Sequence, residues 1–172
     1  MKALSLTQPW ATLVVIGAKR NETRSWGLSH HLPITIAIHA AKGLGLVGGL
    51  TAFRHLINSD PYRAPLLKWL GQERPYQIYD LPRGAIVAVA DVVGCFPTSG
   101  AGYYRDPNRR VITRVTDQER AFGDYSPGRF VWLLDNIRAL PEPIPAKGAL
   151  GLWELDAVTL AAVEGQLEAA HV

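Results

Sequence analysis

The chain has 172 residues, of which 48% are hydrophobic and 19% charged; this is enough apolar sequence for one buried core and too much for a disordered chain. The longest apolar run, residues 13–18, is far shorter than the ~18 residues of a membrane span, and the one cysteine, Cys95, excludes an internal disulfide and a cysteine-based metal cluster. The formal net charge of +3 comes from thirteen Arg and five Lys against fifteen acids; arginine suits contacts with phosphate and bases, although GC-rich coding also enriches it.

The first elements are a short strand and a helix. Residues 2–6 carry the apolar pattern of a strand, and Thr7 and Gln8 can then cap a helix that has Pro9 in its first turn. The apolar stripe of this helix has the spacing i, i+3, i+4, i+7, and Gly17 is a suitable end for it. Residues 19–26 mix charges with Thr23 and Trp26, which is compatible with a strand on a polar rim.

The middle of the chain alternates strands and helices. Residues 33–40 alternate apolar and polar side chains and predict a strand. Residues 42–57 are glycine-rich at first and then helical, and residues 59–76 contain three prolines and predict a loop with a short helix at 66–70. Residues 84–96 form the clearest strand of the chain, with apolar residues on both faces.

The polar stretch 98–114 predicts a long surface loop that contains Arg105, Arg109 and Arg110. In residues 116–122, Thr116 and Glu119 have the spacing of a capping box.

Three elements follow. Residues 128–140 predict a strand, and residues 151–155 predict another. The prolines of residues 142–145 keep that segment out of a central sheet position, and a C-terminal helix is expected from about residue 156. The whole is α+β, a small curled sheet or mixed β-barrel with peripheral helices, in a single domain of residues 1–172.

The common catalytic motifs are missing from the sequence. It contains no GxGxxG, phosphate-loop, GxSxG or HExxH pattern. Of its five histidines only His30 and His31 are neighbours, and adjacent residues on a strand point to opposite faces. We therefore expect neither a metal site nor a cofactor.

The most concentrated polar signal lies in residues 17–26, GAKRNETRSW. If the chain is extended from Glu22, then Glu22, Arg24 and Trp26 share one face and can hold a polar planar ring. From the spacing alone, a surface ion pair worth ~0–1 kcal/mol is the simpler interpretation.

This segment and the preceding LSLTQPW of residues 4–10 resemble the ASCH family, whose members adopt a PUA-like β-barrel. Further matching blocks are IAIHA at 36–40, GAIVA at 84–88, WLL at 132–134 and PEPIPAKG at 141–148, so the resemblance extends from residue 3 to about 155. It implies a cleft between barrel and helices that binds RNA or another nucleic acid, with the segment 17–24 as its signature.

The resemblance thus gives a set of expected nucleic-acid contacts. Trp10 and Trp26 flank the signature and can stack on bases, and Asp124 and Tyr125 lie in a turn that can close over a base. Gln8, Lys19, Glu22, Arg24 and His39 are expected to line one cleft. The full set expected to bind nucleic acid is Gln8, Trp10, Lys19, Arg24, Trp26, His39, Tyr125 and Arg129.

Some members of the family are amidohydrolases that remove the acetyl group of acetylcytidine, and one lineage is reported to cleave RNA. In the amidohydrolases the signature lysine, here Lys19, acts on the amide, whereas a threonine stands where this chain has Glu22. The catalytic candidates are therefore Lys19, Glu22 and Asp124, with Glu119 as another possible second acid. Burial would make Lys19 a base or nucleophile, and a close Glu22 would hold it charged.

The sequence leaves three kinds of function open. The first is a nucleic-acid-binding protein, the second a hydrolase acting on RNA or on an acylated nucleoside, and the third an adaptor that uses its proline-rich edge and C-terminal helix. Residues 1–6 lack the features of a signal peptide, so a cytoplasmic location without membrane attachment is expected. The oligomeric state stays open.

Overall fold

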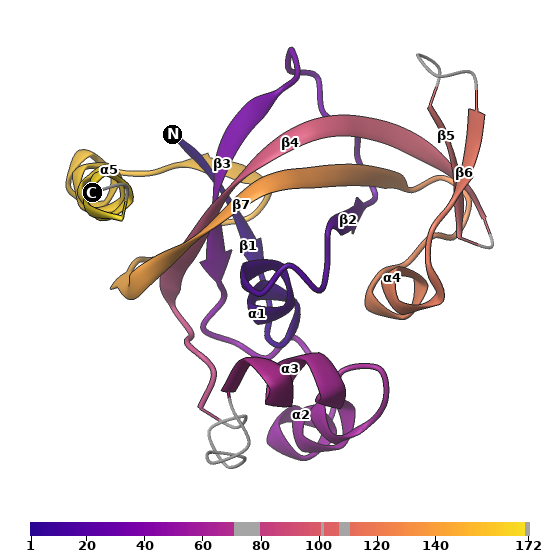
Figure 1. The fold of residues 1–172 in the computed structure, drawn as a ribbon, viewed down its shortest axis with the longest axis horizontal. Helices are drawn as coiled ribbons and strands as arrows, with labels where there is room; N and C mark the ends of the chain where they lie inside the picture. The colour runs from indigo at the N-terminus through magenta and orange to yellow at the C-terminus, as the bar shows by residue number, and fades with distance from the viewer. Residues whose placement is uncertain (71–79, 101, 107–110, 171–172) are drawn as a thin grey trace. The chain divides into compact units, whose positions relative to one another are not determined.

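The computed structural model describes residues 1–70, 80–100, 102–106 and 111–170 (Figure 1). Its strands are β1 (Lys2–Leu6), β2 (Asn21–Arg24), β3 (Ile34–Ala40), β4 (Ala85–Gly100), β5 (Tyr103–Asp106), β6 (Val111–Arg114), β7 (Phe130–Pro145) and β8 (Leu152–Glu154). Its helices are α1 (Trp10–Val15), α2 (Gly49–Asn58), α3 (Arg63–Leu70), α4 (Asp117–Phe122) and α5 (Ala157–Ala169).

The chain separates into two compact units. Unit 1 comprises Met1–Ala18, Thr35–Ala90 and Ile137–Val172, and unit 2 comprises Lys19–Ile34 and Asp91–Asn136. Strands β4 and β7, of 16 residues each, contribute residues to both units. A single domain therefore stays a prediction.

The strand order confirms the α+β class but not a closed barrel. In order of hydrogen-bonded neighbours the described strands run β2-β7-β4-β3-β1-β8, with β5 on β4 and β6 on β5. Within the described ranges this order has two ends, β2 and β8, so it does not close into a ring. None of the described helices is long and apolar enough to cross a membrane.

Unit 1 is built on β1, which runs parallel to β3 and antiparallel to β8. The register places Ser5 of β1 directly beside His39 of β3. Side chains from the sheet and from α5 form a core whose fully buried members are Ala3, Ala37, Ile86, Val89 and Val163. This core fixes the strand ends that carry Ser5 and His39.

The helices of unit 1 follow the sequence pattern closely. Helix α1 buries Leu13 and Val14 as its apolar stripe predicts, and the chain leaves it at Gly17, whose φ of +70° favours glycine. Helix α3 neighbours both α1 and α2 (Figure 1). The Trp10 ring meets the Tyr62 ring edge to face, with ring centroids 6.3 Å apart. Helix α5 stands apart from these three (Figure 1). Its N-cap is Asp156, whose side chain accepts a hydrogen bond from the Thr159 N–H at 2.7 Å.

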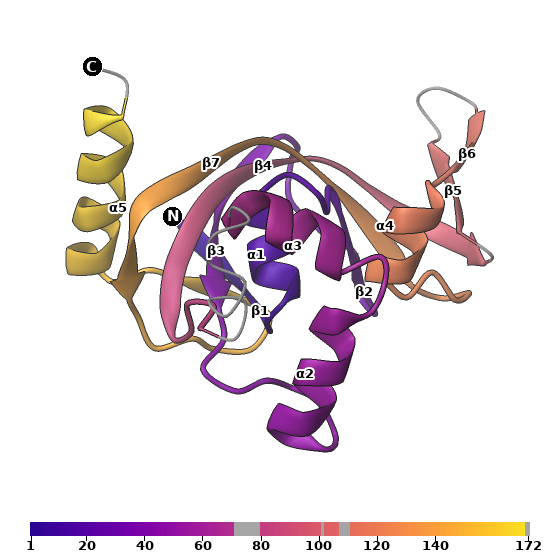
Figure 2. The same cartoon turned by 60° about the horizontal axis from the view of Figure 1, so that its bottom comes forward.

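Unit 2 contains β2, paired antiparallel with β7, and the antiparallel pair β5 and β6. Helix α4 lies near the start of β5, and a Cβ added at Gly102 would lie 3.0 Å from the Arg120 side chain of α4 (Figure 2). One hydrophobic cluster of this unit consists of the buried side chains of Phe96, Tyr104, Val115, Tyr125 and Val131.

The expected loop of residues 98–114 is wrong in part, because β4 continues to Gly100 and is followed by β5 and β6. The cause is the buried ring of Tyr104, which stacks on Phe96 with centroids 5.7 Å apart and anchors β5. The glycines around it resemble loop signals in the sequence. Arg105 lies in β5, whereas Arg109 and Arg110 lie outside the described residues.

The second difference is the length of β7, which includes Pro143 and Pro145. The pairing of β7 with β2 covers only Phe130–Leu133. The prolines lie in the other half of the strand, where their missing N–H groups cost no bond to β2.

Candidate functional site

The signature lysine of the sequence is buried in unit 2. The Lys19 ammonium donates hydrogen bonds to the carbonyl oxygens of Asn21 and of Phe122, the second at 3.1 Å, and lies 3.3 Å from Oε2 of Glu22. Its side chain is 1% exposed. Each of its three N–H bonds therefore has an acceptor within the protein.

Glu22 links this lysine to an arginine nearer the surface. Its Oε1 lies 2.9 Å from Nε of Arg24, so one carboxylate is shared by two cations. The Glu22 side chain is 9% exposed and that of Arg24 is 25% exposed. Residues 22 and 24 share one face of β2, as the sequence predicts, and the structure joins them in a buried ion-pair network.

Glu119 fixes the segment that carries these residues. Its carboxylate accepts hydrogen bonds from the backbone N–H groups of Arg20 and of Asn21, the second at 3.3 Å. Burial raises the pKa of Glu119, and the Arg20 N–H and the charge of Lys19 oppose this shift. Glu119 thus acts as an acceptor at the point where the chain enters β2.

The turn after α4 adds a second acid and a second arginine. Asp124 accepts hydrogen bonds from the N–H and hydroxyl of Ser126, which lower its pKa, and lies 3.2 Å from Nε of Arg129. The Arg129 guanidinium also donates to the carbonyl of Thr23 at 3.3 Å. The turn is therefore attached to β2 through Thr23, whose hydroxyl accepts from the Asp124 N–H at 3.0 Å.

The aromatic candidates of unit 2 are held inside it. Tyr125 is 4% exposed, and burial raises its pKa far above the usual value of a tyrosine. Trp26 is half-buried and meets the fully buried Trp132 edge to face, with centroids 4.7 Å apart. Trp26 is thus partly exposed as a residue, whereas Tyr125 is part of the core.

Unit 1 holds the other candidates, Gln8, Trp10 and His39, so the expected convergence with Lys19, Glu22 and Arg24 stays a prediction. The Gln8 amide is fully buried; it donates to the Pro82 carbonyl at 2.7 Å and accepts from the Thr12 N–H at 3.1 Å. This amide thereby ties the Pro82 segment to α1.

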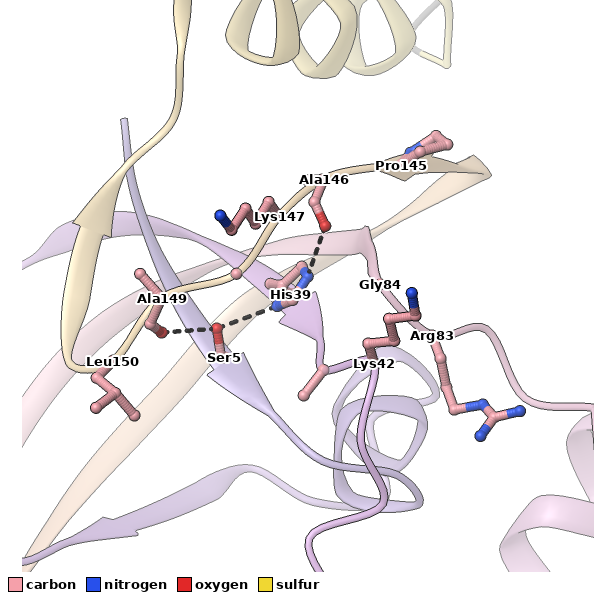
Figure 3. A pocket seen from close by; sticks show the side chains of 12 residues that line it. Ser5, His39, Lys42, Arg83, Gly84, Pro145, Ala146, Lys147, Ala149 and Leu150 are labelled. Carbon is pink, nitrogen blue, oxygen red and sulfur yellow. Dashed lines mark hydrogen bonds between the residues drawn. The ribbon is translucent and has the colours of Figure 1, made fainter.

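His39 is 2% exposed and lies between two segments. Its Nε2 lies 3.2 Å from the Ala146 carbonyl, and its Nδ1 lies 3.1 Å from the Ser5 hydroxyl (Figure 3). Burial lowers its pKa, and the hydrogen bond to Ala146 opposes this effect. A neutral ring therefore carries its proton on Nε2, because a carbonyl can only accept.

Beside His39 is an open pocket of about 880 Å³ in unit 1. Its polar lining comes from Ser5, His39 and three cationic residues that sequence reasoning missed, Lys42, Arg83 and Lys147. Lys147 belongs to the block PEPIPAKG, which was the one available signal. Lys42 follows β3 and Arg83 precedes β4. Neither residue belongs to a sequence motif that could have indicated a role.

The described residues contain no group of three or more histidines, cysteines, aspartates or glutamates placed to hold a metal ion.

The chain is similar to activating signal cointegrator 1 of Homo sapiens, at 27% identity over 154 residues, and to that of Mus musculus, at 25%. These matches cover 89% of the chain but only 22% of each relative, so the chain spans about a fifth of the length of the curated relatives it matches. Among solved structures, ASCH from Zymomonas mobilis matches with a TM-score of 0.50 and 13% identity, over 95% of this chain and 93% of that one.

No protein-family model matches the chain. The likeness in structure nevertheless shows that the chain has the fold of an ASCH protein, which confirms the resemblance seen in its sequence.

Proposed function

We propose that this ASCH-fold chain binds nucleic acid, RNA in the first instance, through the segment of residues 19–26 and does not hydrolyse it. The observation that carries the proposal is the burial of Lys19, whose side chain is 1% exposed and whose ammonium donates two hydrogen bonds to backbone carbonyls and pairs with Glu22. An amine that attacks an amide needs a lone pair and a path to the substrate. The burial of Lys19 removes the path to the substrate.

The acids of unit 2 support the same choice. The exposed Asp124 has a lowered pKa, so it is ionised at neutral pH and a poor proton donor. Glu119 has its carboxylate occupied by two backbone N–H groups. Asp124 is therefore a poor general acid, and the Glu119 carboxylate already serves as an acceptor for the backbone.

Binding rests on the two arginines that these contacts hold in place. Arg24 and Arg129 are 25% and 28% exposed, and each is anchored at Nε by a carboxylate. A guanidinium presents five N–H donors in a rigid fork, so one that is anchored at Nε can still approach a phosphate. The half-buried Trp26 is the aromatic residue of the same segment that could contact a base.

The test is the anisotropy of a labelled single-stranded RNA, titrated between about 50 and 200 mM salt. Arg24→Ala and Arg129→Ala should each weaken binding and lower the salt slope by about one. The matched control is Arg114→Ala, which removes a 59% exposed arginine from the same unit. If the two variants keep the affinity and the salt slope of the unmodified chain, this segment is not the RNA surface. An affinity that does not change with salt concentration would favour the adaptor alternative.

A further inference from the structure

The strands β5 and β6 lie side by side in unit 2 and carry a mixed aromatic and cationic face (Figure 1). Successive side chains of a strand point to opposite faces. On β5, Tyr104 and Asp106 are buried, whereas Tyr103 and Arg105 are exposed. Tyr103 and Arg105 therefore share the outer face of this strand pair.

The register with β6 completes the outer face. Tyr103 lies opposite Arg114, and Arg105 lies opposite Ile112, which is 57% exposed. Directly opposite residues of an antiparallel pair point to the same face, with Cβ atoms about 5 Å apart. We call Tyr103, Arg105 and Ile112 together the β5–β6 patch.

The charge of this region is positive. Residues 103–114 contain four arginines and a single acid, Asp106, which is buried. The guanidinium of Arg114 donates a hydrogen bond to Asp117 at 3.1 Å. The side chain of Arg105 forms no ion pair with another described residue, so its N–H donors are available to an anion.

The size of the patch limits what can bind there. The two strands have four residues each. At a rise of about 3.3 Å per residue and a strand spacing of about 4.8 Å, their outer face covers on the order of 130 Å². A stable protein interface buries about 800 Å² on each partner, whereas a single nucleic-acid strand can bind through one stacking ring and one cation at a time. The patch thus fits a nucleic-acid strand better than a protein surface.

The backbone that carries the patch is close to Arg129, one of the arginines proposed above to bind RNA. The Arg129 carbonyl accepts a hydrogen bond from the Thr98 N–H at 2.8 Å, and Thr98 pairs with Tyr104. Two spacings between neighbouring strands therefore separate Arg129 from β5, roughly 10 Å along the backbone hydrogen bonds. A strand of RNA that is bound by Arg129 can reach this distance with its next few nucleotides.

We propose that the β5–β6 patch extends the RNA-binding surface of unit 2, with a base stacked on Tyr103 beside Ile112 and a neighbouring phosphate bound by Arg105. The inference rests on the function proposed above and adds the residues that bind the RNA strand beyond Arg129. None of the sequence blocks that carry the ASCH resemblance lies in residues 98–129.

Anisotropy titrations of a labelled oligouridine, at about 50 and 200 mM salt, test the proposal. Arg105→Ala should weaken binding and lower the salt slope by about one, because it removes one phosphate contact. Tyr103→Ala should weaken binding about tenfold without changing the slope, because stacking needs a ring and no charge. Tyr103→Phe keeps the ring and should therefore keep the affinity.

The matched control is Arg114→Ala, which removes an arginine of the same strand pair that Asp117 already holds. An Arg105→Ala variant that binds no more weakly than Arg114→Ala would overturn the proposal. A Tyr103→Phe variant as weak as Tyr103→Ala would also overturn it, since the ring would then not be the binding group.

Cross-linking locates the RNA on the unmodified chain and does not depend on how a variant folds. An oligouridine that contains 4-thiouridine is irradiated in the complex, and the cross-linked peptides are identified by mass spectrometry. The peptide that contains Tyr103 should be among them. Cross-links that are confined to other peptides would contradict the proposal.

The same titrations separate this inference from the function on which it rests. If Arg24→Ala and Arg129→Ala weaken binding but Tyr103→Ala and Arg105→Ala do not, the segment of residues 19–26 binds RNA and the β5–β6 patch is not part of the surface. The reverse result would overturn the function proposed for the segment and leave the patch as the RNA surface. No binding of the oligouridine would overturn both.

Discussion

Lys19 and Glu22 form an ion pair of 3.3 Å inside unit 2, with side chains that are 1% and 9% exposed. The pair is three residues apart in sequence, where an ion pair is usually a weak surface contact. Here the same carboxylate also pairs with Arg24 at 2.9 Å. Because this ion pair is buried, the conformation of β2 depends on it.

The first prediction follows from that burial. Glu22→Gln leaves Lys19 without its carboxylate, and removal of one partner of a buried pair costs about 3 kcal/mol of the free energy of unfolding. Asp117→Asn is the control, because it breaks ion pairs whose carboxylate is 75% exposed and should cost less than about 1 kcal/mol. Urea unfolding measures both; similar losses in the two variants would contradict a special role for the buried pair.

The second prediction concerns Gly148, in the segment of residues 145–150 that packs against His39. Gly148→Ala should destabilise the chain by about 1–3 kcal/mol, because its Cβ would lie 2.3 Å from the His39 ring and overpack the site. Gly43→Ala has no atom within 4 Å of the new Cβ and serves as the control in the same unit. The measurement is the difference in the midpoint of thermal unfolding between the two variants. Equal midpoints would mean that residues 145–150 shift to accommodate the new Cβ without loss of stability.

The third prediction is a pH dependence of stability. Since burial lowers the pKa of His39 in the folded chain, the unfolded chain binds more protons as the pH falls through about 6.5. The stability that neutral His39 contributes is present above that pH and is lost below it. The unmodified chain should therefore lose up to about 1 kcal/mol more than His39→Gln between about pH 7.5 and 5.5. Parallel stability curves for the two proteins would show that His39 does not titrate differently in the two states.

Much of the local structure could be predicted from the sequence, because it depends on neighbouring residues. The stripe of α1, the cap of α5 at Asp156 and the hydrogen bond from the Glu119 N–H to the Thr116 hydroxyl follow from spacing alone. The long-range hydrogen-bond partners of Glu119 could not be predicted from spacing. A capping-box glutamate returns to its own N-cap, whereas this carboxylate accepts from Arg20 and Asn21, about a hundred residues earlier in the chain.

The pocket could not be predicted for the same reason. Ser5 and His39 are neighbours because β1 and β3 pair in parallel, and a parallel register cannot be read from either strand alone. The antiparallel pair of β5 and β6 was missed because Gly100 and Gly102, which both have positive φ, resemble loop residues, although Gly100 ends β4 and β5 begins directly after Gly102. Whether such a segment forms a strand depends on its pairing with other strands in the folded chain.

The central claim is that the segment of residues 19–26 binds nucleic acid and leaves it intact. The most direct test uses an RNA oligomer that contains one acetylcytidine. The chain is incubated with this RNA, the complex is isolated, and the mass of the recovered RNA is measured by mass spectrometry. Because Lys19 is buried and held by two carbonyls and by Glu22, the account predicts that the RNA is bound and recovered at full length with its acetyl group. RNA recovered without the acetyl group, or cleaved, by the unmodified chain and not by Lys19→Met would contradict it.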